Sequence, residues 1–373
     1  VEGMVASAME YLRRCREASF GQVVVSIKSS NVRVMVQAYR MLVAAMRREG
    51  MRYPLHLGVT EAGDDREGRV KSAVGIGALL CDGIGDTIRV SLTEAPEREI
   101  PVARTLASYF AGRENHAPIP DVDESLYSPY EYRRRVSAET DGIGGGRPPV
   151  IASEIPGEVR SRLFEARIAD IDSIPDGRVV LLSTDNLNGV AEQRAFFLKM
   201  IEKGKTNPVV IRRTYDERDA EALQVKAAAD LGPLLLDGFG DGIWIENRNG
   251  AVAQDEIDAT SLAILQAARV RVSKAEYIAC PSCGRTLYDI ERTLSAIKAR
   301  TSHLRGIRIG VMGCIINGPG EMADADYGYV GSGRITLYKG REIMERNIPQ
   351  ERALDALVEL IRRCGDWREP DTV

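Results

Sequence analysis

Three cysteines near the carboxyl end of the chain have the spacing of a metal or redox site. Cys280 and Cys283 form a C-x-x-C pair after the short apolar run Y-I-A, and Cys314 follows the run I-R-I-G-V-M-G. A C-x-x-C pair lets two thiolates reach one metal centre, and a third cysteine from a neighbouring strand can close on the same centre. Thiolates select zinc, copper(I) or an iron–sulfur cluster.

The residues alone leave several interpretations of these thiols open. Structural zinc would need a fourth cysteine or histidine at ligand spacing, and His303 is poorly placed for that role. A dithiol redox site needs only Cys280 and Cys283, which leaves Cys314 idle. A cluster bound by three cysteines keeps one iron open to a weaker ligand, and Glu321, just past the turn N-G-P-G, could be that ligand. Buried free thiols are the alternative without any site.

A second set of polar residues lies at the predicted ends of N-terminal strands. Lys28 ends one strand, while Arg89 and Ser91 lie two apart in I-R-V-S-L and so point to the same side of another. Two cations and a hydroxyl suit a phosphate-like anion, although solvated or salt-bridged strand ends explain them too. Glu61, in H-L-G-V-T-E-A-G, could accept a hydrogen bond from a substrate hydroxyl or move a proton. His56 fits a structural role as well as a catalytic one.

An alternation of helix-like and strand-like segments must position these polar residues. The predicted helices cover 4–18, 31–49 and 68–81, and the predicted strands cover 23–28, 55–60 and 87–92. Repeated βα units with apolar strands imply a parallel sheet whose carboxyl ends carry function. Because a (β/α)₈ barrel needs eight strands and only three precede residue 110, we expect a partial barrel.

A second βα block follows a linker. Residues 111–149 are rich in turn-forming residues. The strands predicted after them lie near 150 and at 179–184, 208–213 and 242–246, with a last helix at 255–270. The two blocks resemble each other at an offset of 155 residues, because D-G-I-G-D at 82–86 matches D-G-F-G-D at 237–241 and Asn31 matches Asn186. Constant spacing favours a duplication.

The second block lacks the polar strand-end residues of the first. The residues that face Lys28, His56, Glu61, Arg89 and Ser91 in the second block are Ser183, Val210, Tyr215, Trp244 and Glu246, respectively, with an offset of 154 for the second and third pairs and 155 for the others. A copy that keeps its glycines and apolar positions but loses this set has kept structure and lost catalysis. We therefore predict an α/β protein with TIM-barrel-type units over 1–110, a linker and structural βα insert over 111–271, and a small α+β domain with the three cysteines over 272–373, which the family resemblance described below implies is an iron–sulfur domain.

The elements expected in the last segment are four strands and a closing helix. The strands are predicted at 275–279, 306–312, 327–330 and 334–338, and the helix at 350–363. The cysteines would then follow the first two strands.

The composition excludes several classes of partner. The 373 residues include 50 Lys and Arg against 54 Asp and Glu, a net charge of −4, which argues against a basic nucleic-acid binder. No apolar stretch approaches the ~20 residues of a membrane span. Six cysteines are too few for a disulfide scaffold in a chain of this length. We expect a cytoplasmic protein with no membrane or nucleic-acid partner.

Four ordered motifs resemble a known enzyme family. H-L-G-V-T-E-A-G, G-I-G-D-T-I-R-V-S-L, Y-I-A-C-P-S-C and G-C-I-I-N-G-P-G-E are similar, in this order, to those of 4-hydroxy-3-methylbut-2-enyl diphosphate synthases of the methylerythritol phosphate route to isoprenoids. The resemblance covers 20–110 and 272–365, and the block between resembles the insert of the family's three-domain form. The family's barrel begins before the position of Val1, so we expect a C-terminal portion with little or no turnover in isolation.

The resemblance also implies a cofactor and partners. A [4Fe–4S] cluster would be held by Cys280, Cys283 and Cys314, with Glu321 as a displaceable fourth ligand. Residues Lys28, Arg89 and Ser91, with His56 beside them, would hold the diphosphate of 2-C-methyl-D-erythritol 2,4-cyclodiphosphate, and Glu61 would address a substrate hydroxyl. Flavodoxin or ferredoxin would supply two electrons, and a homodimer is compatible with the family. From a different class, a metal-stabilised scaffold or a thiol oxidoreductase remains the alternative.

Overall fold

Helices and short parallel strands alternate at the N-terminal end, as the sequence predicts. The computed structural model describes residues 1–370. The helices of this block are α1 (Glu2–Glu17), α2 (Val32–Arg48), α3 (Asp65–Cys81) and α4 (Glu99–Phe110), and its strands are β1 (His56–Gly58) and β2 (Thr87–Arg89). The three predicted helices are confirmed. The α2 helix starts where the Asn31 side chain accepts a hydrogen bond from the N–H of Val34 at 3.3 Å.

The prediction of a regular strand at 23–28 is wrong. In this segment and just beyond it, Val25 and Ser29 form isolated parallel bridges with Leu55 and Val59. Val24 is 62% exposed, so the apolar run does not lie between two covered faces. The segment still follows the direction of β1, which places Lys28 beside that strand.

The second block forms its own parallel sheet. Its strand order is β5-β9-β8-β7-β6, so the two blocks do not share a sheet. The strands are β5 (Val150–Ile151), β6 (Phe164–Ala166), β7 (Val180–Leu182), β8 (Val209–Tyr215) and β9 (Gly242–Asn247), and the helices are α5 (Gly157–Arg160), α6 (Gly189–Glu202), α7 (Ala220–Leu236) and α8 (Gln254–Ala267). The four predicted strands are confirmed, and β6 was not predicted.

The linker is mostly irregular. It holds a small antiparallel hairpin of β3 (Glu139–Thr140) and β4 (Ile143–Gly144). Short 3₁₀ helices lie in the linker at Arg113–Asn115 and Glu124–Leu126. Others lie outside it, at Pro96–Arg98, Ala152–Glu154 and Ile168–Ser173.

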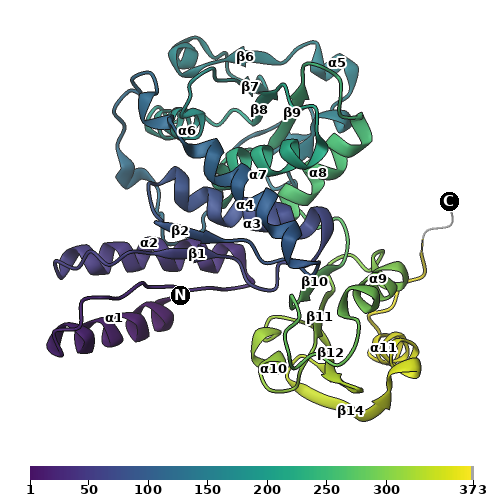
Figure 1. The fold of residues 1–373 in the computed structure, drawn as a ribbon. Helices are drawn as coiled ribbons and strands as arrows, with labels where there is room; N and C mark the ends of the chain where they lie inside the picture. The colour runs from purple at the N-terminus through teal and green to yellow at the C-terminus, as the bar shows by residue number, and fades with distance from the viewer. Residues whose placement is uncertain (371–373) are drawn as a thin grey trace. The chain divides into compact units, whose positions relative to one another are not determined.

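Both blocks belong to one compact unit, which comprises 1–59, 69–90 and 100–271. Figure 1 shows α3 and α7 within this unit. The two helices pack against each other at glycines. A Cβ at Gly77 would lie 2.8 Å from Cα of Ala229, and a Cβ at Gly232 would lie 2.7 Å from the Val74 side chain. Gly77 and Gly232 have the 155-residue offset, and so do Val74 and Ala229. The contact is therefore reciprocal, as in an interface between two copies of one structure.

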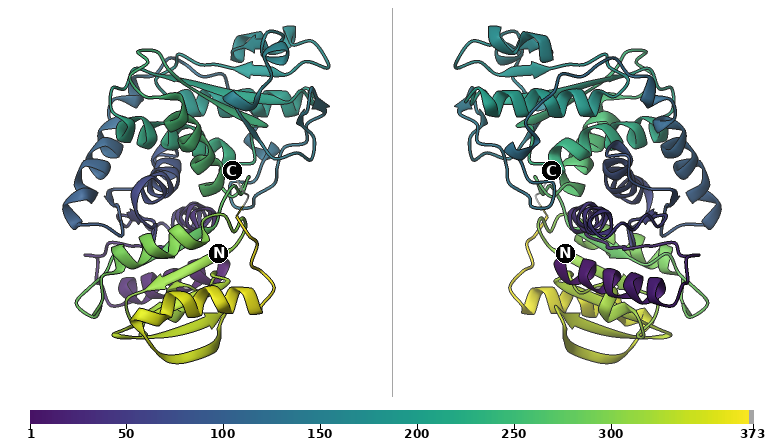
Figure 2. Two further views of the ribbon diagram at one scale, coloured as in Figure 1. Left: turned by 90° about the vertical axis from the view of Figure 1, so that its right-hand side faces the viewer. Right: turned by 90° about the vertical axis from the view of Figure 1, so that its left-hand side faces the viewer.

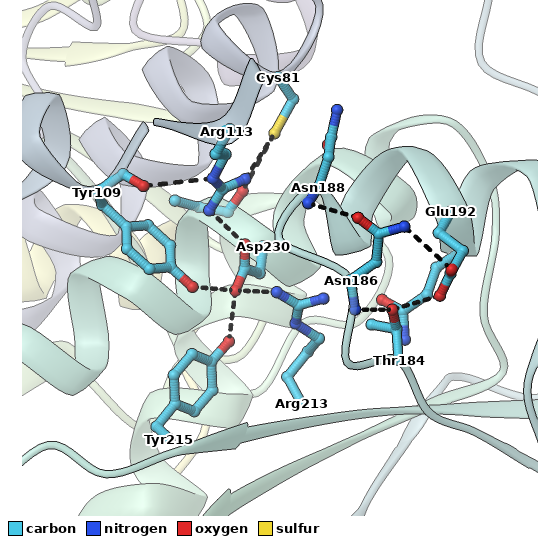
Figure 3. A network of polar contacts seen from close by, with 12 residues as sticks. Cys81, Tyr109, Arg113, Thr184, Asn186, Asn188, Glu192, Arg213, Tyr215 and Asp230 are labelled. Carbon is cyan, nitrogen blue, oxygen red and sulfur yellow. Dashed lines mark hydrogen bonds and ion pairs between the residues drawn. The ribbon is translucent and has the colours of Figure 1, made fainter. Parts of the chain in front are cut away.

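A buried carboxylate connects the end of the first block to the second. Asp230 on α7 accepts hydrogen bonds from the hydroxyls of Tyr109 (2.6 Å) and Tyr215 (3.0 Å), and from the guanidinium groups of Arg213 (2.7 Å) and Arg113 (3.0 Å), as Figure 3 shows. Burial alone would raise the pKa of Asp230, but the two arginines hold it below its usual value. The four donors come from α4, the linker and β8, so one charge centre joins three segments.

A second compact unit contains the C-terminal domain and two loops, at 60–68 and 91–99. Its sheet has the order β10-β11-β12-β13-β14, with the first three strands parallel and the last two antiparallel. The strands are β10 (Glu276–Ala279), β11 (Arg308–Met312), β12 (Tyr327–Ser332), β13 (Arg334–Lys339) and β14 (Glu342–Pro349), and the helices are α9 (Ile290–Thr301), α10 (Gly318–Glu321) and α11 (Gln350–Arg363). Figure 2 shows α11, in yellow, along this sheet.

The predicted C-terminal elements are confirmed, and β14 is an addition. Six of its first seven residues are exposed, so the strand lacks the alternation of apolar and polar residues that marks a half-buried strand. As an edge strand it pairs only with β13 among the described strands.

None of the helices in the described chain is both long and apolar enough to cross a lipid bilayer.

Candidate functional site

A small cationic group forms around Gly58 at the carboxyl end of β1. Gly58 pairs with Arg89 of β2, and a Cβ on Gly58 would lie 3.0 Å from the carbonyl oxygen of Arg89 and 3.3 Å from Cε of Lys28. The absence of a side chain at this position lets the two cationic residues approach each other. The structure thus brings together Lys28 and Arg89, which the sequence only places at separate strand ends.

His56 lies in the same group. Its Nδ1 is 2.8 Å from the hydroxyl of Thr87 on β2. Burial lowers the pKa of His56, and the positive charges of Lys28 and Arg89 lower it further. The imidazole is therefore held toward its neutral form beside two cations, and an anion bound there would reverse this effect.

Glu61 and Ser91 lie in the two loops that belong to the second unit. Both are buried, and Glu61 has φ +48°, a conformation that costs energy for a residue with a side chain. Next to Glu61, Ala62 forms a parallel bridge with Ala279, the last residue before Cys280. The hydroxyl of Thr93 donates to the carbonyl oxygen of Ala279 at 3.1 Å.

These contacts connect the loops to the first cysteine strand. In the same unit Lys298 of α9 binds the carboxylates of Asp64 and Glu67, and Lys274 also binds Glu67. The loops with Glu61 and Ser91 are therefore held by the domain that carries the cysteines.

Cys280 begins the first cysteine loop, directly after β10. Its sulfur accepts hydrogen bonds from the N–H groups of Gly313, at 3.3 Å, and Ser282. Burial raises the pKa of Cys280, and the charges of Glu321 and Cys283 raise it further. Backbone donors to sulfur are one of the means by which proteins tune an iron–sulfur cluster.

Cys283 lies in the opposite environment, at the surface. Ser282 before it has φ +73°, which turns the loop back. Hydrogen bonds from the backbone and side chain of Arg285 lower the pKa of Cys283. The hydroxyl of Thr286 accepts a hydrogen bond from the N–H of Cys283 at 3.2 Å. This loop stabilises a thiolate at position 283 without any metal.

Cys314 and Glu321 complete the group from the loop after β11. The charges of Cys283 and Cys314 contribute to the raised pKa of Arg285, after its hydrogen bond to Cys283, and Glu321 acts on both Arg285 and Cys280. Cys283 and Glu321 therefore lie within electrostatic reach of Cys280, and Cys283, Cys314 and Glu321 lie within electrostatic reach of Arg285. Cys280 and Cys314 follow neighbouring parallel strands.

The donor set has the chemistry of an iron–sulfur cluster site. In the part of the chain that the structure describes, no three His, Cys, Asp or Glu side chains are close enough to hold one metal ion. A cubane cluster places its own iron and sulfide atoms between the thiolates, so its ligands are farther apart. Three thiolates with N–H donors to sulfur and one carboxylate are the chemistry that such a cluster uses.

Three residues of this region were not predicted from the sequence. Arg285 and Thr286 act on Cys283, and the hydroxyl of Tyr288 donates to the carbonyl oxygen of Met312 at 3.0 Å, which ties the two cysteine loops together. The only signal for them is their position, directly after C-x-x-C-G.

Comparison with known proteins assigns the chain to a family. Residues 1–104 match the model of the GcpE TIM-barrel domain, and residues 276–363 match that of the GcpE protein C-terminal domain. A relative from Parabacteroides distasonis is 48% identical over 98% of this chain and 70% of its own length. The chain belongs to the 4-hydroxy-3-methylbut-2-en-1-yl diphosphate synthase family.

Other members of this family are similar along the same span. A relative from Phocaeicola vulgatus is 44% identical over 99% of this chain and 71% of its own length, and one from Chlorobaculum tepidum is 35% identical over 99% and 67%. All three carry the name 4-hydroxy-3-methylbut-2-en-1-yl diphosphate synthase (flavodoxin). These matches confirm the family predicted from the four motifs, its oxidoreductase class and the TIM-barrel-type units of the first block.

Proposed function

We propose that the chain takes part in the reductive ring opening and dehydration of 2-C-methyl-D-erythritol 2,4-cyclodiphosphate to 4-hydroxy-3-methylbut-2-enyl diphosphate. The reaction consumes two electrons and releases water. The observation that carries the proposal is the group of three cysteines and Glu321 at the ends of β10 and β11, in a chain of this family.

The cationic group around Gly58 binds the diphosphate in this proposal. Lys28 and Arg89 supply charge-assisted hydrogen bonds, and Ser91 adds a hydroxyl donor. His56 takes up a proton more readily once an anion lies beside it, because the anion offsets the two cations that lower its pKa. Glu61 accepts a hydrogen bond from a substrate hydroxyl.

The C-terminal domain holds a [4Fe–4S] cluster in this proposal. Cys280, Cys283 and Cys314 are its thiolate ligands, and Glu321 is a displaceable fourth ligand. When bound, the cluster supplies electrons one at a time at low potential. Flavodoxin is the donor we propose, since the relatives' names specify it.

The second block is a structural insert in this proposal. Its polar residues at the positions of the polar set bind other side chains of the first unit. The side chain of Arg212 donates to the hydroxyl of Ser183 at 2.9 Å and pairs with Glu165 at 3.1 Å. The hydroxyl of Tyr215, at the position of Glu61, donates to Asp230. These groups are therefore occupied within the fold.

Anaerobic reconstitution with iron and sulfide tests the cluster. We expect close to four iron and four sulfide per chain, and a loss of both on Cys314→Ser, with Cys364→Ser as the matched control outside the site. One zinc without sulfide would support the scaffold alternative. Disulfide exchange that is lost on Cys283→Ser but unchanged on Cys314→Ser would support a thiol oxidoreductase.

Substrate binding is the second test. The cyclodiphosphate should bind to the reconstituted chain, and Lys28→Ala or Arg89→Ala should weaken binding by roughly tenfold or more, the scale of a lost charge-assisted hydrogen bond. Equal affinity of these variants and the unchanged protein would contradict the proposed anion site.

A further inference from the structure

The first unit contains a cavity of about 480 Å³ at the amino ends of β8 and β9. Its walls come from the linker and from the turns that precede the two strands, and we call it the linker cavity. Its basic wall contains Arg133, Arg134, Arg135 and Lys205. Its apolar wall contains Leu126, Tyr127, Val136, Ile201 and Phe239. The volume lies in the range of small-molecule sites.

The basic wall has donors that the protein does not satisfy. The Nε atoms of Arg134 and Arg135 are buried without a hydrogen-bond partner among the described residues. The Arg135 side chain is only 4% exposed. The other guanidinium nitrogens of these two arginines bind backbone carbonyls and Asp241. Unpaired buried donors cost energy, so these two guanidinium groups keep hydrogen-bonding capacity that no described residue uses.

The wall also carries excess positive charge. Arg134 and Arg135 share the single carboxylate of Asp241, at 3.1 and 3.3 Å. Arg133 is exposed and forms no ion pair with any described residue, and the Lys205 ammonium donates only to the carbonyl oxygen of Ile174. Glu131 is one of two acids in the lining, and the other, Asp237, is already paired with two arginines outside the cavity.

The apolar wall is built on stacked rings. Phe239 lies parallel to Phe197, with 4.9 Å between ring centroids and 5° between planes, and the Tyr127 ring is 5.8 Å from Phe239. The side chains of Leu126, Val136 and Ile201 offer no hydrogen-bonding groups. Such a wall suits a hydrocarbon better than a nucleobase, whose polar edge would lose its hydrogen bonds to water.

The basic wall is held firmly in place. The N–H of Arg135 donates to the carbonyl oxygen of Gly238 at 2.9 Å. A Cβ at Gly238, which has φ +85°, would lie 2.1 Å from the carbonyl oxygen of Arg133. The linker therefore runs directly over the D-G-F-G-D turn. The cavity lies at the opposite strand ends from Ser183 and Glu246, so it is separate from the positions that match the polar set of the first block.

We propose that the linker cavity binds a diphosphate ester with a short branched hydrocarbon chain. The diphosphate contacts Arg133, Arg135 and Lys205, and the hydrocarbon lies against Phe239 and Tyr127. The choice of hydrocarbon rests on the proposed function, because the product of that reaction is a five-carbon allylic diphosphate. Binding itself requires neither the cluster nor turnover.

Isothermal titration calorimetry on the full chain tests this proposal. The Lys28→Ala/Arg89→Ala variant removes the proposed substrate site, so that any remaining binding belongs elsewhere. The probes are 3-methylbut-2-enyl diphosphate, inorganic diphosphate, the uncharged alcohol 3-methylbut-2-enol and adenosine diphosphate. We expect the allylic diphosphate to bind at least roughly tenfold more tightly than inorganic diphosphate because of its buried carbons, and the alcohol not to bind.

Two charge changes at exposed lining residues locate the binding. Val136 is 80% exposed, and Arg133 is exposed too, so Val136→Glu and Arg133→Glu should fold normally. Each should weaken binding of the allylic diphosphate by roughly tenfold or more through like-charge repulsion. Arg104→Glu makes the same charge change as Arg133→Glu at an exposed residue outside the lining and should bind as before.

Several results would overturn the proposal. The first is that the allylic diphosphate does not bind to the Lys28→Ala/Arg89→Ala variant, and the second is that it binds unchanged to both glutamate variants. The others are equal affinity for inorganic and allylic diphosphate, and tighter binding of adenosine diphosphate than of the allylic diphosphate. Intact binding in the Lys28→Ala/Arg89→Ala background, together with no binding of the cyclodiphosphate to the unchanged chain, would count against the proposed function alone. Thermal melting curves of each variant, measured without ligand, show whether it is folded.

Discussion

The two thiols of the C-x-x-C pair differ in reactivity because their surroundings differ. Hydrogen bonds from Arg285 lower the pKa of Cys283, whereas burial raises that of Cys280 and raises the pKa of Cys81 to about 12. Since the thiolate is the nucleophile, we expect iodoacetamide at pH 8 to modify metal-free protein at Cys283 first, at Cys280 more slowly and at Cys81 last.

Peptide mass spectrometry over a time course measures this order. Arg285→Ala should slow the modification of Cys283, because it removes a donor to the thiolate. Arg305→Ala, which changes an exposed arginine on a different loop, is the control. Equal rates at Cys280 and Cys283 would show that the loop does not stabilise the thiolate.

His56 offers a titration that reports on the anion site. Burial and the charges of Lys28 and Arg89 lower its pKa, so it loses its proton below the usual value of about 6.5. A bound diphosphate offsets those charges and should raise the pKa. The affinity gained from protonated His56 is then present at low pH and lost as the pH rises through the pKa of the bound state.

Imidazole NMR signals measure this effect directly, because the chain has only three histidines. His56→Gln identifies the signal, and His116, in the linker, is the internal control. We expect the pKa of His56 to rise on addition of the cyclodiphosphate, whereas the ring signals of His116 should not move when the ligand is added at constant pH. A His56 pKa that does not move with saturating ligand would place the anion elsewhere.

At the scale of elements, the α3–α7 contact depends on two glycines. A Cβ at Gly77 would meet the backbone of Ala229, which cannot move without shifting α7. We expect Gly77→Ala to lower the free energy of unfolding by ~1–3 kcal/mol, the usual cost of overpacking. Gly3→Ala is the matched control in α1, where a Cβ meets nothing within 4 Å and helix propensity improves. Urea unfolding measures both, and equal stability of Gly77→Ala and the unchanged protein would contradict this close packing.

The elements that the sequence predicted best are those with strong local signals. The closing helix α11 has a regular apolar face, and α2 has an asparagine cap, so both were predicted to within one residue of each end. The segment at 23–28 has a strong apolar run but no full ladder, and β14 has a ladder but no apolar alternation. Whether each of these two segments forms a regular strand depends on pairing with residues distant in the sequence. A local sequence pattern does not show that pairing.

For the candidate site too, the sequence predicts what local patterns show and misses what depends on distant contacts. The cysteine motif predicted the thiols by residue type and spacing, and the strand ends predicted Lys28 and Arg89. Nothing local predicts that Gly58 lets these two meet, or that Arg285 faces Cys283, because both depend on how loops fold back. The assignment of each site residue to a ligand or substrate remains a prediction.

At the scale of the whole molecule, four charges connect the two blocks. Arg40 of α2 binds Asp82 and Asp237, both at 2.7 Å, and Arg194 of α6 binds the same two carboxylates at 3.0 and 2.8 Å. Each arginine thus pairs with one aspartate of its own block and one of the other. Together with the reciprocal glycine contacts, this is the pattern that a duplicated structure packed against its copy would show.

The four charged residues Arg40, Asp82, Arg194 and Asp237 should make the two blocks unfold together. Arg194→Met leaves two carboxylates, one of them fully buried, with a single arginine between them, and breaking such a buried group costs about 3–5 kcal/mol. Arg40→Met should cost a similar amount, since it contacts the same two groups. Removal of all four charges, as Arg40→Met/Arg194→Met/Asp82→Asn/Asp237→Asn, should cost less than the two single changes combined, because no charge is left unpaired.

Urea unfolding at pH 7 and at lower pH separates this electrostatic effect from lost packing. Burial alone would raise the pKa of Asp237, but Arg194 and Arg40 lower it, so its contribution is present above the unfolded-state pKa of ~3.9 and is lost as the pH falls through the folded value. The difference in stability between the unchanged protein and Arg194→Met should therefore shrink as the pH falls below about 4. Arg14→Met, which breaks an exposed pair with Glu10, should have little effect at either pH. A penalty for Arg194→Met that is the same at both pH values would mean that the arginine acts through packing alone, and that the charges do not join the blocks.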